Sequence, residues 1–454
     1  MTRKVGGREA TTGVIPGRFC LSVGNPGTPT PAGWHWRPLL EMARLESGHT
    51  PSRRKPEYWG GNISWIGIKD ATGNHGRTIH ETMQYTNELG IANSAARILP
   101  KNTVCLSRTA SVGYVVVMGK PMATSQDFAN WVCGSDLDYR FLKYALLLEN
   151  EALQRFSYGS THRTIYYPEL KAFHLCVPPL PEQREIAAIL GALDDKIELN
   201  RKMAATLEAM ARALYRSWFV DFDPVTARAE GRAPAHMPPA TAALFPDRFG
   251  ENGLPEGWSL GILGDIARNS RKGADPKTTA PDTPYVGLEH IPRRSISISD
   301  WGRAEDVGST KSIMKKGQFL FGKLRPYFHK VGLVPLDGIC STDILVVEAK
   351  SDSWREFVLS VISSVDLVEH VNAASTGTRM PRAKWHDLAN YQVVMPSSEI
   401  AIAYSKIVRP MHDRITSMLH ESRTLATLRD TLLPRLMSGE LRVPAARDIV
   451  GDIA

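Results

Sequence analysis

Two short loops of the chain combine glycine, hydroxyl and arginine side chains in a form that suits phosphate binding. Their candidate residues are Tyr158, Ser160, Thr161 and Arg163 in the first loop, and Thr376, Thr378 and Arg379 in the second. Hydroxyls, backbone amides and guanidinium groups are the donors that proteins direct at nucleic-acid phosphates. We therefore interpret both loops as clamps on a DNA backbone. A solvated turn before the strands expected near Leu175 and Tyr391 is the plainer alternative.

A second kind of candidate lies between residues 323 and 330, and consists of Lys323, Arg325, Tyr327 and Lys330. The earlier stretch from Ser107 to Ser111 is taken as its counterpart, with Arg108 as its cation. Arginine suits bidentate contacts to guanine or to a phosphate, and tyrosine can stack or bond to a sugar. We predict that these residues also contact DNA. Surface charge explains a weaker set equally well, namely Lys69, Arg77, Arg293 and Arg294.

A group of charged residues along one expected strand raises the alternative of a nuclease. Asp343, Glu348 and Lys350 resemble a centre in which two carboxylates hold Mg²⁺ and a lysine polarises a water molecule. Glu348 and Lys350 would share one face of the strand. The corresponding positions of the earlier stretch are Val132 and Gly134, which carry no such groups. A self-contained, Mg²⁺-dependent DNA endonuclease is therefore the second interpretation.

Other patterns typical of catalysis are lacking in the sequence. The stretch from Gly113 to Lys120 has the wrong spacing for a phosphate-binding loop. The Asn-Pro-Pro-aromatic motif of amino-methyltransferases does not occur, and Asp221 to Pro224 is no substitute for it. The five cysteines are scattered without a Cys-x-x-Cys pair, which argues against zinc and disulfides and favours a reducing cytoplasm. We expect no catalytic residue, metal or cofactor on this chain.

The composition is that of an ordinary globular chain with a basic balance. Its 454 residues are too many for one core, so two or more domains are expected. Lys and Arg number 55 against 47 Asp and Glu, which gives a net charge of +8 and a pI near 9.2. That balance permits a polyanionic partner without requiring one. Neither a secretory signal nor an apolar run of membrane-spanning length is present.

Most of the sequence consists of two copies of an internal repeat. Matching segments are Gly33-Trp34 and Gly257-Trp258, Trp65–Gly67 and Tyr285–Gly287, and Ser125–Phe128 and Ser341–Ile344. Further on, the offset stays at 218 positions, from Gly159 and Gly377 to Leu214 and Leu432 (377 minus 159, and 432 minus 214). Such duplication predicts two domains of one fold. Runs such as 114–118 and 344–347 predict buried strands within them.

Each copy closes with a long amphipathic helix. In the first helix, over residues 181–219, the heptad positions include Ile186, Leu193, Ile197, Leu207 and Leu214, with Asn200 as a single polar position. In the second, over 398–437, they include Ile415, Leu425 and Leu432. This spacing predicts a coiled-coil seam of about five heptads. We expect Pro410 to kink or restart the second helix, and Pro434 to end or bend it.

The predicted fold class is α+β, with two tandem mixed α/β domains and two long helices that pair as an antiparallel coiled coil. The antiparallel direction follows because one chain must bring both helices together with the domains at opposite ends. The predicted boundaries are a flexible leader (1–32), a first mixed domain (33–180), a first helix (181–219), a linker (220–256), a second mixed domain (257–397), a second helix (398–437) and a tail (438–454).

Four strings resemble the specificity subunits (HsdS) of type I restriction-modification systems. They are LCVPPLPEQREIAAILGALDDKIELNRKM from Leu175, LLPRLMSGELRV from Leu432, GWSLGILGDI from Gly257 and FGKLRPYFHKVGLVPLDGICSTD from Phe321. The resemblance covers the chain from Gly33 to Val443. One departure is MPSSEIAIAYSKI at the start of the second helix, which lacks the PxxEQ-like form seen after the first domain.

The resemblance implies that each mixed domain is a target recognition domain for one half of a bipartite, asymmetric site in double-stranded DNA. It also implies that the helices hold the domains apart and dock two modification (methyltransferase) subunits, which restriction (translocase and nuclease) subunits then join. S-adenosylmethionine, ATP and Mg²⁺ would belong to those partners. A 37-residue helix is about 55 Å long, and half-sites one DNA turn apart are separated by about 34 Å. Helix length is therefore expected to act as a ruler between half-sites.

Overall fold

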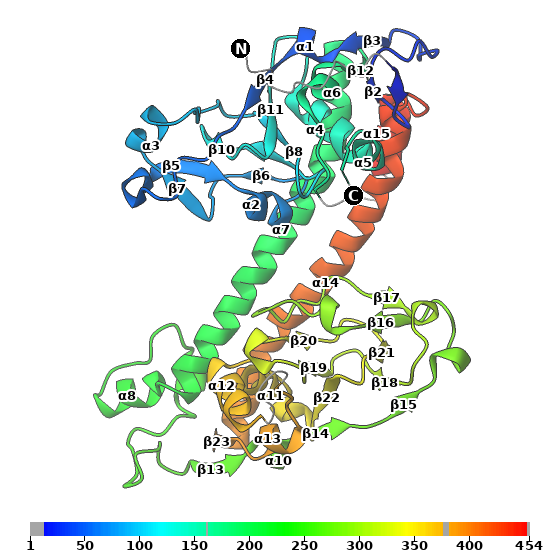
Figure 1. Cartoon of the computed structure of the whole chain (residues 1–454). Helices are drawn as coiled ribbons and strands as arrows, with labels where there is room; N and C mark the ends of the chain where they lie inside the picture. The colour runs from blue at the N-terminus through cyan, green and yellow to red at the C-terminus, as the bar shows by residue number, and fades with distance from the viewer. Residues whose placement is uncertain (1–12, 160–161, 376–380, 452–454) are drawn as a thin grey trace. The chain divides into compact units, whose positions relative to one another are not determined.

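The computed structural model describes residues 13–159, 162–375 and 381–451 (Figure 1). The chain forms two compact units: the first contains Met1–Asp195 and Ala426–Ala454, and the second contains Lys196–Leu425. The candidates outside the described residues are Ser160, Thr161, Thr376, Thr378 and Arg379.

The first unit is built on three sheets whose orders are β1-β2-β12-β3, β10-β5-β7 and β4-β11-β8-β9-β6. Their strands are β1 (Ile15–Pro16), β2 (Leu21–Val23), β3 (His35–Pro38), β4 (Ala43–Ser47), β5 (Trp59–Ile66), β6 (Thr78–Ile79), β7 (Gln84–Thr86), β8 (Val104–Ser107), β9 (Val115–Met118), β10 (Ala123–Thr124), β11 (Phe128–Cys133) and β12 (Phe173–Val177). The short helices are α1 (Leu39–Met42), η1 (Pro56–Tyr58), α2 (Ile68–Gly73), α3 (Glu88–Ala92), α4 (Tyr139–Leu148), α5 (Asn150–Arg155) and α6 (Tyr167–Lys171). All residues of β8 and β9 are buried, with α4 packed against them, which confirms the strand predicted over 114–118.

The second unit repeats this plan with sheets β13-β23, β14-β22-β19-β20 and β15-β18-β21-β16-β17. The strands are β13 (Ser259–Ile262), β14 (Ala267–Ser270), β15 (Gly273–Ala274), β16 (Pro284–Val286), β17 (Gly302–Arg303), β18 (Lys311–Met314), β19 (Phe319–Gly322), β20 (Val331–Leu333), β21 (Gly338–Cys340), β22 (Ile344–Ala349) and β23 (Gln392–Met395). The short helices are α10 (Leu263–Ile266), η2 (Pro276–Thr278), η3 (Leu288–His290), η4 (Ala304–Asp306), η5 (Pro326–Phe328), η6 (Asp352–Trp354), α11 (Arg355–Ile362), α12 (Val365–Ala374) and α13 (Trp385–Ala389). The order β14-β22-β19-β20 matches β4-β11-β8-β9, so the duplicated sequence is a duplicated fold.

The same turn opens both copies. Gly33 and Gly257 have φ values of +82° and +78°, in the left-handed region that glycine enters without a steric penalty. The following Trp34 and Trp258 donate their backbone N–H to Pro31 and Pro255, at 2.9 and 3.0 Å. Both indole side chains are buried. The Gly-Trp repeat of the sequence therefore marks equivalent positions in the two units.

The two long helices are α7 (Leu180–Phe219) and α14 (Ser398–Met437). In the second unit, Ala204 packs with Ile415 and Met418, and the Tyr404 hydroxyl lies 3.4 Å from the Ala211 carbonyl. Residues later in α7 therefore contact residues earlier in α14, so the two helices are antiparallel. The predicted fold class is confirmed: both units contain a mixed α/β domain, and the two long helices are antiparallel.

The predicted seam residues are placed as follows. In the first unit, Ile186, Leu193 and Leu432 are buried; in the second, Asn200, Ile415 and Leu425 are buried, and Ile197, Leu207 and Leu214 are half-buried. The Asn200 amide donates to Glu421 Oε2 at 3.0 Å and to Ser422 Oγ at 3.3 Å. Its buried polar group thus has partners on the facing helix.

Pro410 is expected to kink or restart the second helix, and the expectation of a restart is wrong. The helix α14 continues through Pro410 and ends at Met437, three residues after Pro434. Pro410 and Lys406 are both exposed, so the carbonyl of residue 406 that loses its helical donor lies on the solvent side. Water can satisfy that carbonyl, which removes much of the reason for a break.

The prediction of a flexible leader over 1–32 is wrong for its second half. Strand β2 pairs with β12, and Leu21 and Val23 are fully buried. The carboxylate of Glu149 accepts four backbone N–H groups, those of residues 18, 19, 20 and 21, at 2.6–3.2 Å. A buried carboxylate more than a hundred positions away thus fixes this segment, which no local pattern indicates.

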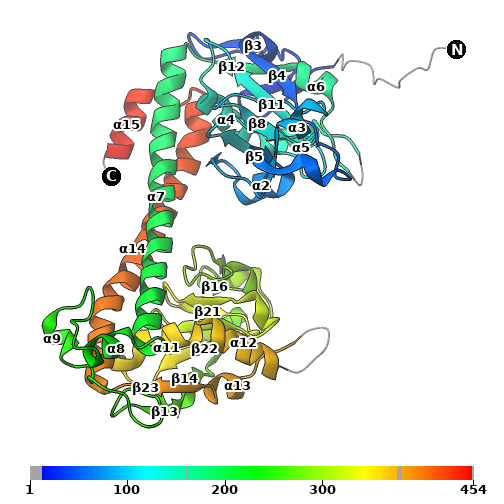
Figure 2. The ribbon, with the colours of Figure 1, turned by 90° about the vertical axis from the view of Figure 1, so that its left-hand side faces the viewer.

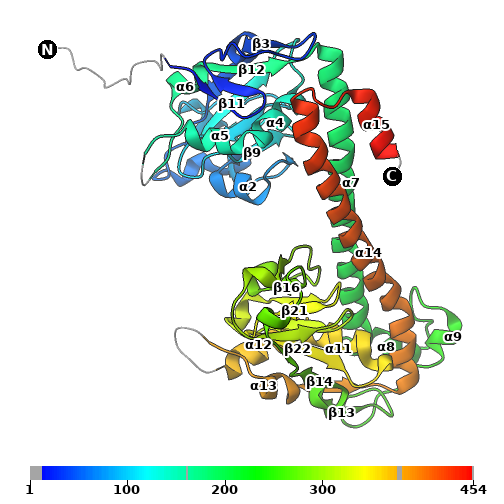
Figure 3. The ribbon, with the colours of Figure 1, turned by 90° about the vertical axis from the view of Figure 1, so that its right-hand side faces the viewer.

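The predicted linker and tail also fold onto the units. Within 220–256 lie α8 (Asp223–Ala229) and α9 (Pro239–Ala242) (Figure 3). Val225 and Phe245 are buried in the same core cluster as Trp218. The tail forms α15 (Val443–Gly451) in the first unit, close to the start of α7 (Figure 2). Ion pairs from residues 442 and 447 of this tail to Glu182 and Glu185, at 3.0 and 3.3 Å, hold it there.

Among the described helices, none is by itself long and apolar enough to cross a membrane. The bent pair Asp352–Ile362 and Val365–Ala374 meets the length and composition criteria only jointly, with a bend of 67°. Its apolar side chains, among them Phe357, Leu359 and Val371, are buried in the core of the second unit.

Candidate nucleic-acid interface

In the first unit, the structure brings two of the predicted loops together. The turn after β8 lies against the segment 163–165: Ile165 N–H donates to the Arg108 carbonyl at 2.8 Å, and Ala110 N–H donates to the Arg163 carbonyl at 3.1 Å. The hydroxyls of Thr109 and Thr164 are 2.6 Å apart. A third loop joins them, because Arg108 N–H donates to the Asp127 carbonyl at 2.8 Å. We call this arrangement the loop junction of the first unit.

The second unit has the same loop junction. Lys323 N–H donates to the Asp343 carbonyl at 2.8 Å, Ala383 N–H to the Lys323 carbonyl at 2.9 Å, and Arg325 N–H to the Pro381 carbonyl at 2.9 Å. Each bond has its counterpart in the first unit. Arg325 and Ala110 also share a left-handed backbone, with φ of 51° and 61°. The segment 381–383 directly follows the second predicted clamp, 376–379.

These bonds correct the sequence alignment by one residue. The sequence comparison paired Ser107 with Lys323, whereas the backbone bonds pair Arg108 with Lys323 and Ala110 with Arg325. The two cations also make the same contact: Arg108 Nη2 donates to the Gln126 carbonyl at 3.1 Å, and Lys323 Nζ to the Thr342 carbonyl at 2.5 Å. One basic residue is therefore built into each junction, and Arg108 further lies 4.9 Å from the ring centre of Tyr167.

The exposed side chains around each junction are the ones available to a ligand. Arg163 is exposed, with a long contact of 3.5 Å to the Gln154 side-chain oxygen, while Tyr158 is half-buried and its backbone pairs with Thr164. In the second unit, Arg325 is exposed and Tyr327 is 49% exposed.

Lys330 is half-buried beside the second junction and donates to the Leu288 carbonyl. Arg293, which sequence reasoning rated lower, stacks over the Phe328 ring at 3.9 Å.

Several cations lie at or beside the second junction, together with the carboxylate of Asp343, which pairs with Arg382. Burial, together with the neighbouring Arg382, lowers the pKa of Lys323 below its usual value. Burial and the neighbouring Arg293 likewise lower the pKa of Lys330. A cation crowded by other cations is stabilised when an anion binds beside it. This surface is therefore suited electrostatically to phosphate.

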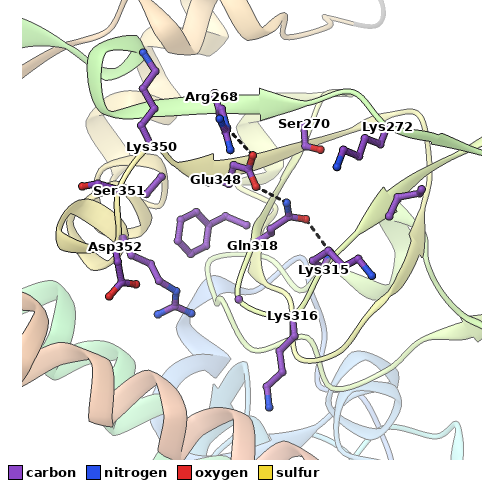
Figure 4. Close-up of a pocket in the computed structure, with 15 residues that line it drawn as sticks. Arg268, Ser270, Lys272, Lys315, Lys316, Gln318, Glu348, Lys350, Ser351 and Asp352 are labelled. Atoms are coloured by element: carbon purple, nitrogen blue, oxygen red, sulfur yellow. Dashed lines mark hydrogen bonds and ion pairs between the residues drawn. The ribbon is translucent and has the colours of Figure 1, made fainter.

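The three residues of the nuclease alternative do not converge. Asp343 precedes β22 and pairs with Arg382, whereas Glu348 lies near the other end of the strand, about 17 Å away at the usual rise per residue. Glu348 is held by Arg268 at 2.6 Å and by Gln318 at 2.7 Å, in a basic hollow of about 510 Å³ (Figure 4). Over the described residues, no cluster of three His, Cys, Asp or Glu could hold a metal.

An arginine that sequence reasoning missed lies in the first unit, before η1. The guanidinium of Arg53 is 4.2 Å from the ring centre of Trp59 and 5.0 Å from that of Trp65, and Nη2 donates to Gln84 Oε1 at 2.8 Å. The two indoles meet edge to face at 5.2 Å. The available signal was a run of three basic residues, 53–55, shortly before Trp59 and Trp65.

Comparisons with known proteins show which proteins this chain is similar to. Residues 31–209 match the family model for the type I restriction modification DNA specificity domain. The chain is 26% identical to the type I restriction enzyme MjaIX specificity subunit of Methanocaldococcus jannaschii, over 91% of this chain and 94% of that protein. It is 24% identical to the HindI specificity subunit of Haemophilus influenzae, over 66% of this chain and 76% of that one.

A solved structure has the same fold. The crystal structure of the S subunit of a type I restriction-modification system from M. genitalium superposes with a TM-score of 0.57, at 16% identity. The match covers 91% of this chain and 97% of that chain. The duplicated mixed domains and the long helices are thus a known arrangement.

Proposed function

We propose that this chain, which is similar in sequence to specificity subunits of type I restriction-modification systems, is itself such a subunit, and that each of its units binds one half of a bipartite, asymmetric DNA site. The observation that carries the proposal is the duplicated loop junction. Its three backbone bonds recur in both units, while the side chains around them differ: Ala110 stands where the second unit has Arg325. The same backbone arrangement with different side chains suits two different half-sites.

The roles of the side chains at a junction follow from how deeply each is buried. Arg108 and Lys323 each donate to a carbonyl of their own junction, so they position the loops and add positive charge nearby. Arg163, Arg325 and Tyr327 are exposed and are assigned the direct contacts with DNA. Phosphate contacts fix the position of the duplex, and base contacts distinguish sequences.

The helices α7 and α14 are proposed to dock two methyltransferase subunits, with restriction subunits completing the assembly. S-adenosylmethionine, ATP and Mg²⁺ are then cofactors of those partners, and this chain performs no reaction itself. The alternative of a self-contained endonuclease loses its basis, because Arg268 and Gln318 occupy the carboxylate of Glu348, far along the strand from Asp343.

Selection of binding sites from random duplexes tests the proposal. The full chain, assembled with its methyltransferase subunits, should enrich a two-part sequence, and its affinity should fall steeply with salt. Arg163→Ala should weaken selection in one half of the sequence only, and Arg325→Ala in the other half only. Arg248→Ala, an exposed arginine paired with Glu256, serves as the control and should change neither. Enrichment of one continuous motif that both variants affect alike would overturn the proposal.

A further inference from the structure

Among the described residues, the arginine stacked on two indoles in the first unit has no counterpart in the second. We propose that Arg53 is a specificity-determining residue that recognises a guanine in the half-site bound by the first unit. The inference rests on the proposed function, because it needs DNA to lie on the loop junctions. It goes beyond that function by naming one residue that recognises a base and the base that it recognises.

The orientation of Arg53 is fixed before any ligand binds. Trp59 and Trp65 hold the guanidinium by cation–π contact, and Gln84 takes one of its N–H groups. The indoles are themselves fixed, since Trp59 Nε1 donates to the Ser52 carbonyl at 3.3 Å and Trp65 Nε1 to the His49 carbonyl at 3.1 Å. A held arginine loses little side-chain entropy when it binds.

The free edge of this arginine matches guanine. Within the described part of the chain, Gln84 is the one hydrogen-bond partner of Arg53, and the residue is exposed. The remaining N–H groups form a planar fork that bonds to guanine O6 and N7 at once. No other base offers two acceptors in that arrangement in the major groove. The geometry therefore favours guanine over the other bases.

The segment that leads to Arg53 contacts the loop junction of the first unit. The Thr50 hydroxyl is 2.5 Å from Gln126 Oε1, and the Gln126 carbonyl accepts from Arg108. Two further basic residues, Arg54 and Lys55, follow Arg53 and are exposed. A duplex that contacts the junction would find them in position to bind its phosphates, which brings the base edges towards Arg53.

The corresponding segment of the second unit cannot make this contact. The one-turn helices η1 and η2 begin at Pro56 and Pro276, so residues 53–55 correspond to 273–275. That segment reads Gly-Ala-Asp instead of Arg-Arg-Lys. Its last residue, Asp275, uses a carboxylate oxygen to accept the Lys277 N–H at 3.0 Å. The difference affects one half-site only, which is what an asymmetric target requires.

The test compares recognition motifs selected by the assembled wild-type protein and by Arg53→Ala and Arg53→Lys. Arg53→Ala should lose preference for guanine at one position of one half-site, by about 5- to 150-fold. Arg53→Lys keeps N–H donors but lacks the planar fork, so it should lose part of that preference. Both variants should keep all other positions of the motif. Arg54→Ala is the matched control, since it removes a neighbouring exposed cation that is not stacked on the indoles. It should lower affinity for all sequences alike. Thermal unfolding of each variant checks that the unit still folds.

A base analogue separates recognition from a structural effect. When 7-deazaguanine, which lacks the N7 acceptor, replaces that guanine, the wild-type protein should bind about 5-fold or more weakly. Arg53→Ala should show no further loss with the analogue. An unchanged motif in both arginine variants, or a uniform loss with a smaller salt dependence, would show a structural or phosphate role and overturn the inference. If the wild-type protein itself selects no two-part motif, the proposed function fails first.

Discussion

A buried carboxylate in the second unit joins α11 to α14 and illustrates how single residues hold this fold. Glu356 is fully buried and pairs with His412, Arg355 and Arg409, the last at 3.4 Å. Burial alone would raise the pKa of Glu356, but its hydrogen bond and charge pairing with His412 and the two arginines outweigh burial and lower it. Ionised Glu356 therefore stabilises the folded chain.

The pH dependence follows from the direction of that shift. A carboxyl whose pKa is lowered by folding contributes its full stability above its unfolded pKa, near 4.5, and loses it as the pH falls through the lower folded value. Glu356→Gln should reduce the free energy of unfolding by about 3 kcal/mol at pH 6. The difference from wild type should shrink between pH 4.5 and 3. Urea unfolding over this range measures it, with exposed Glu369→Gln as the control.

If Glu356→Gln destabilises the chain equally at pH 6 and pH 3, the stabilisation does not come from the ionised carboxylate. A loss of the same size in Glu369→Gln would point to a general effect of charge on the unit.

At the residue scale, the sequence predicted where the loops lie better than what their side chains do. Arg108 and Arg325 were both predicted as DNA contacts, yet Arg108 donates to carbonyls of its own junction, while Arg325 is exposed. The two arginines are not equivalent: the backbone bonds pair Arg108 with Lys323, and Arg325 with Ala110. This pairing differs by one residue from the pairing found in the sequence. Arg53 was missed because its partners, Trp59, Trp65 and Gln84, meet it only after the sheet forms.

At the scale of elements, heptad spacing predicted both long helices closely. The first was predicted over 181–219 and is Leu180–Phe219, and the second was predicted over 398–437 and is Ser398–Met437. A periodic apolar pattern extends over many residues, so one irregular position does not hide it. It therefore indicates long helices reliably. The strands near the N-terminus were missed because their order depends on Glu149, a tertiary contact.

Helix α14 continues through a proline in its first third, and this has a measurable consequence. Pro410→Ala should restore an N–H donor for the carbonyl of residue 406 and raise the free energy of unfolding by about 1 to 3 kcal/mol. Denaturant unfolding measures the change. Ser417→Ala, at an exposed position of the same helix, accounts for helix propensity and should add only about 0.5 kcal/mol. A less stable Pro410→Ala chain would mean that the proline shapes the helix pair.

At the scale of the whole molecule, duplication is the organising feature. Matching sheet orders, matching Gly-Trp turns and matching loop junctions all descend from one repeat that the sequence already showed. The antiparallel direction of the helices could also be predicted, because each helix follows its own domain in one chain. The assignment of residues 426–454 to the first unit could not, since it depends on contacts made after the helices pair.

The proposed ruler function of the helices gives a whole-molecule prediction. Removing one heptad from each of α7 and α14 keeps the phase of the seam and shortens each helix by about 10 Å. The gap between the two halves of the selected DNA motif should then shorten by about three base pairs, at about 3.4 Å each. Inserting one heptad in each helix should lengthen the gap equally. An unchanged gap in both variants would exclude the ruler function.

Mapping methylated positions across the genome of cells that carry this chain with the proposed methyltransferase partners tests the central claim most directly. Two non-identical readers on one chain predict a motif of two unequal specific parts separated by a gap of fixed length. Cells that lack the chain should show no methylation at that motif. A short, continuous palindrome would contradict the account, because a palindrome requires two equivalent readers.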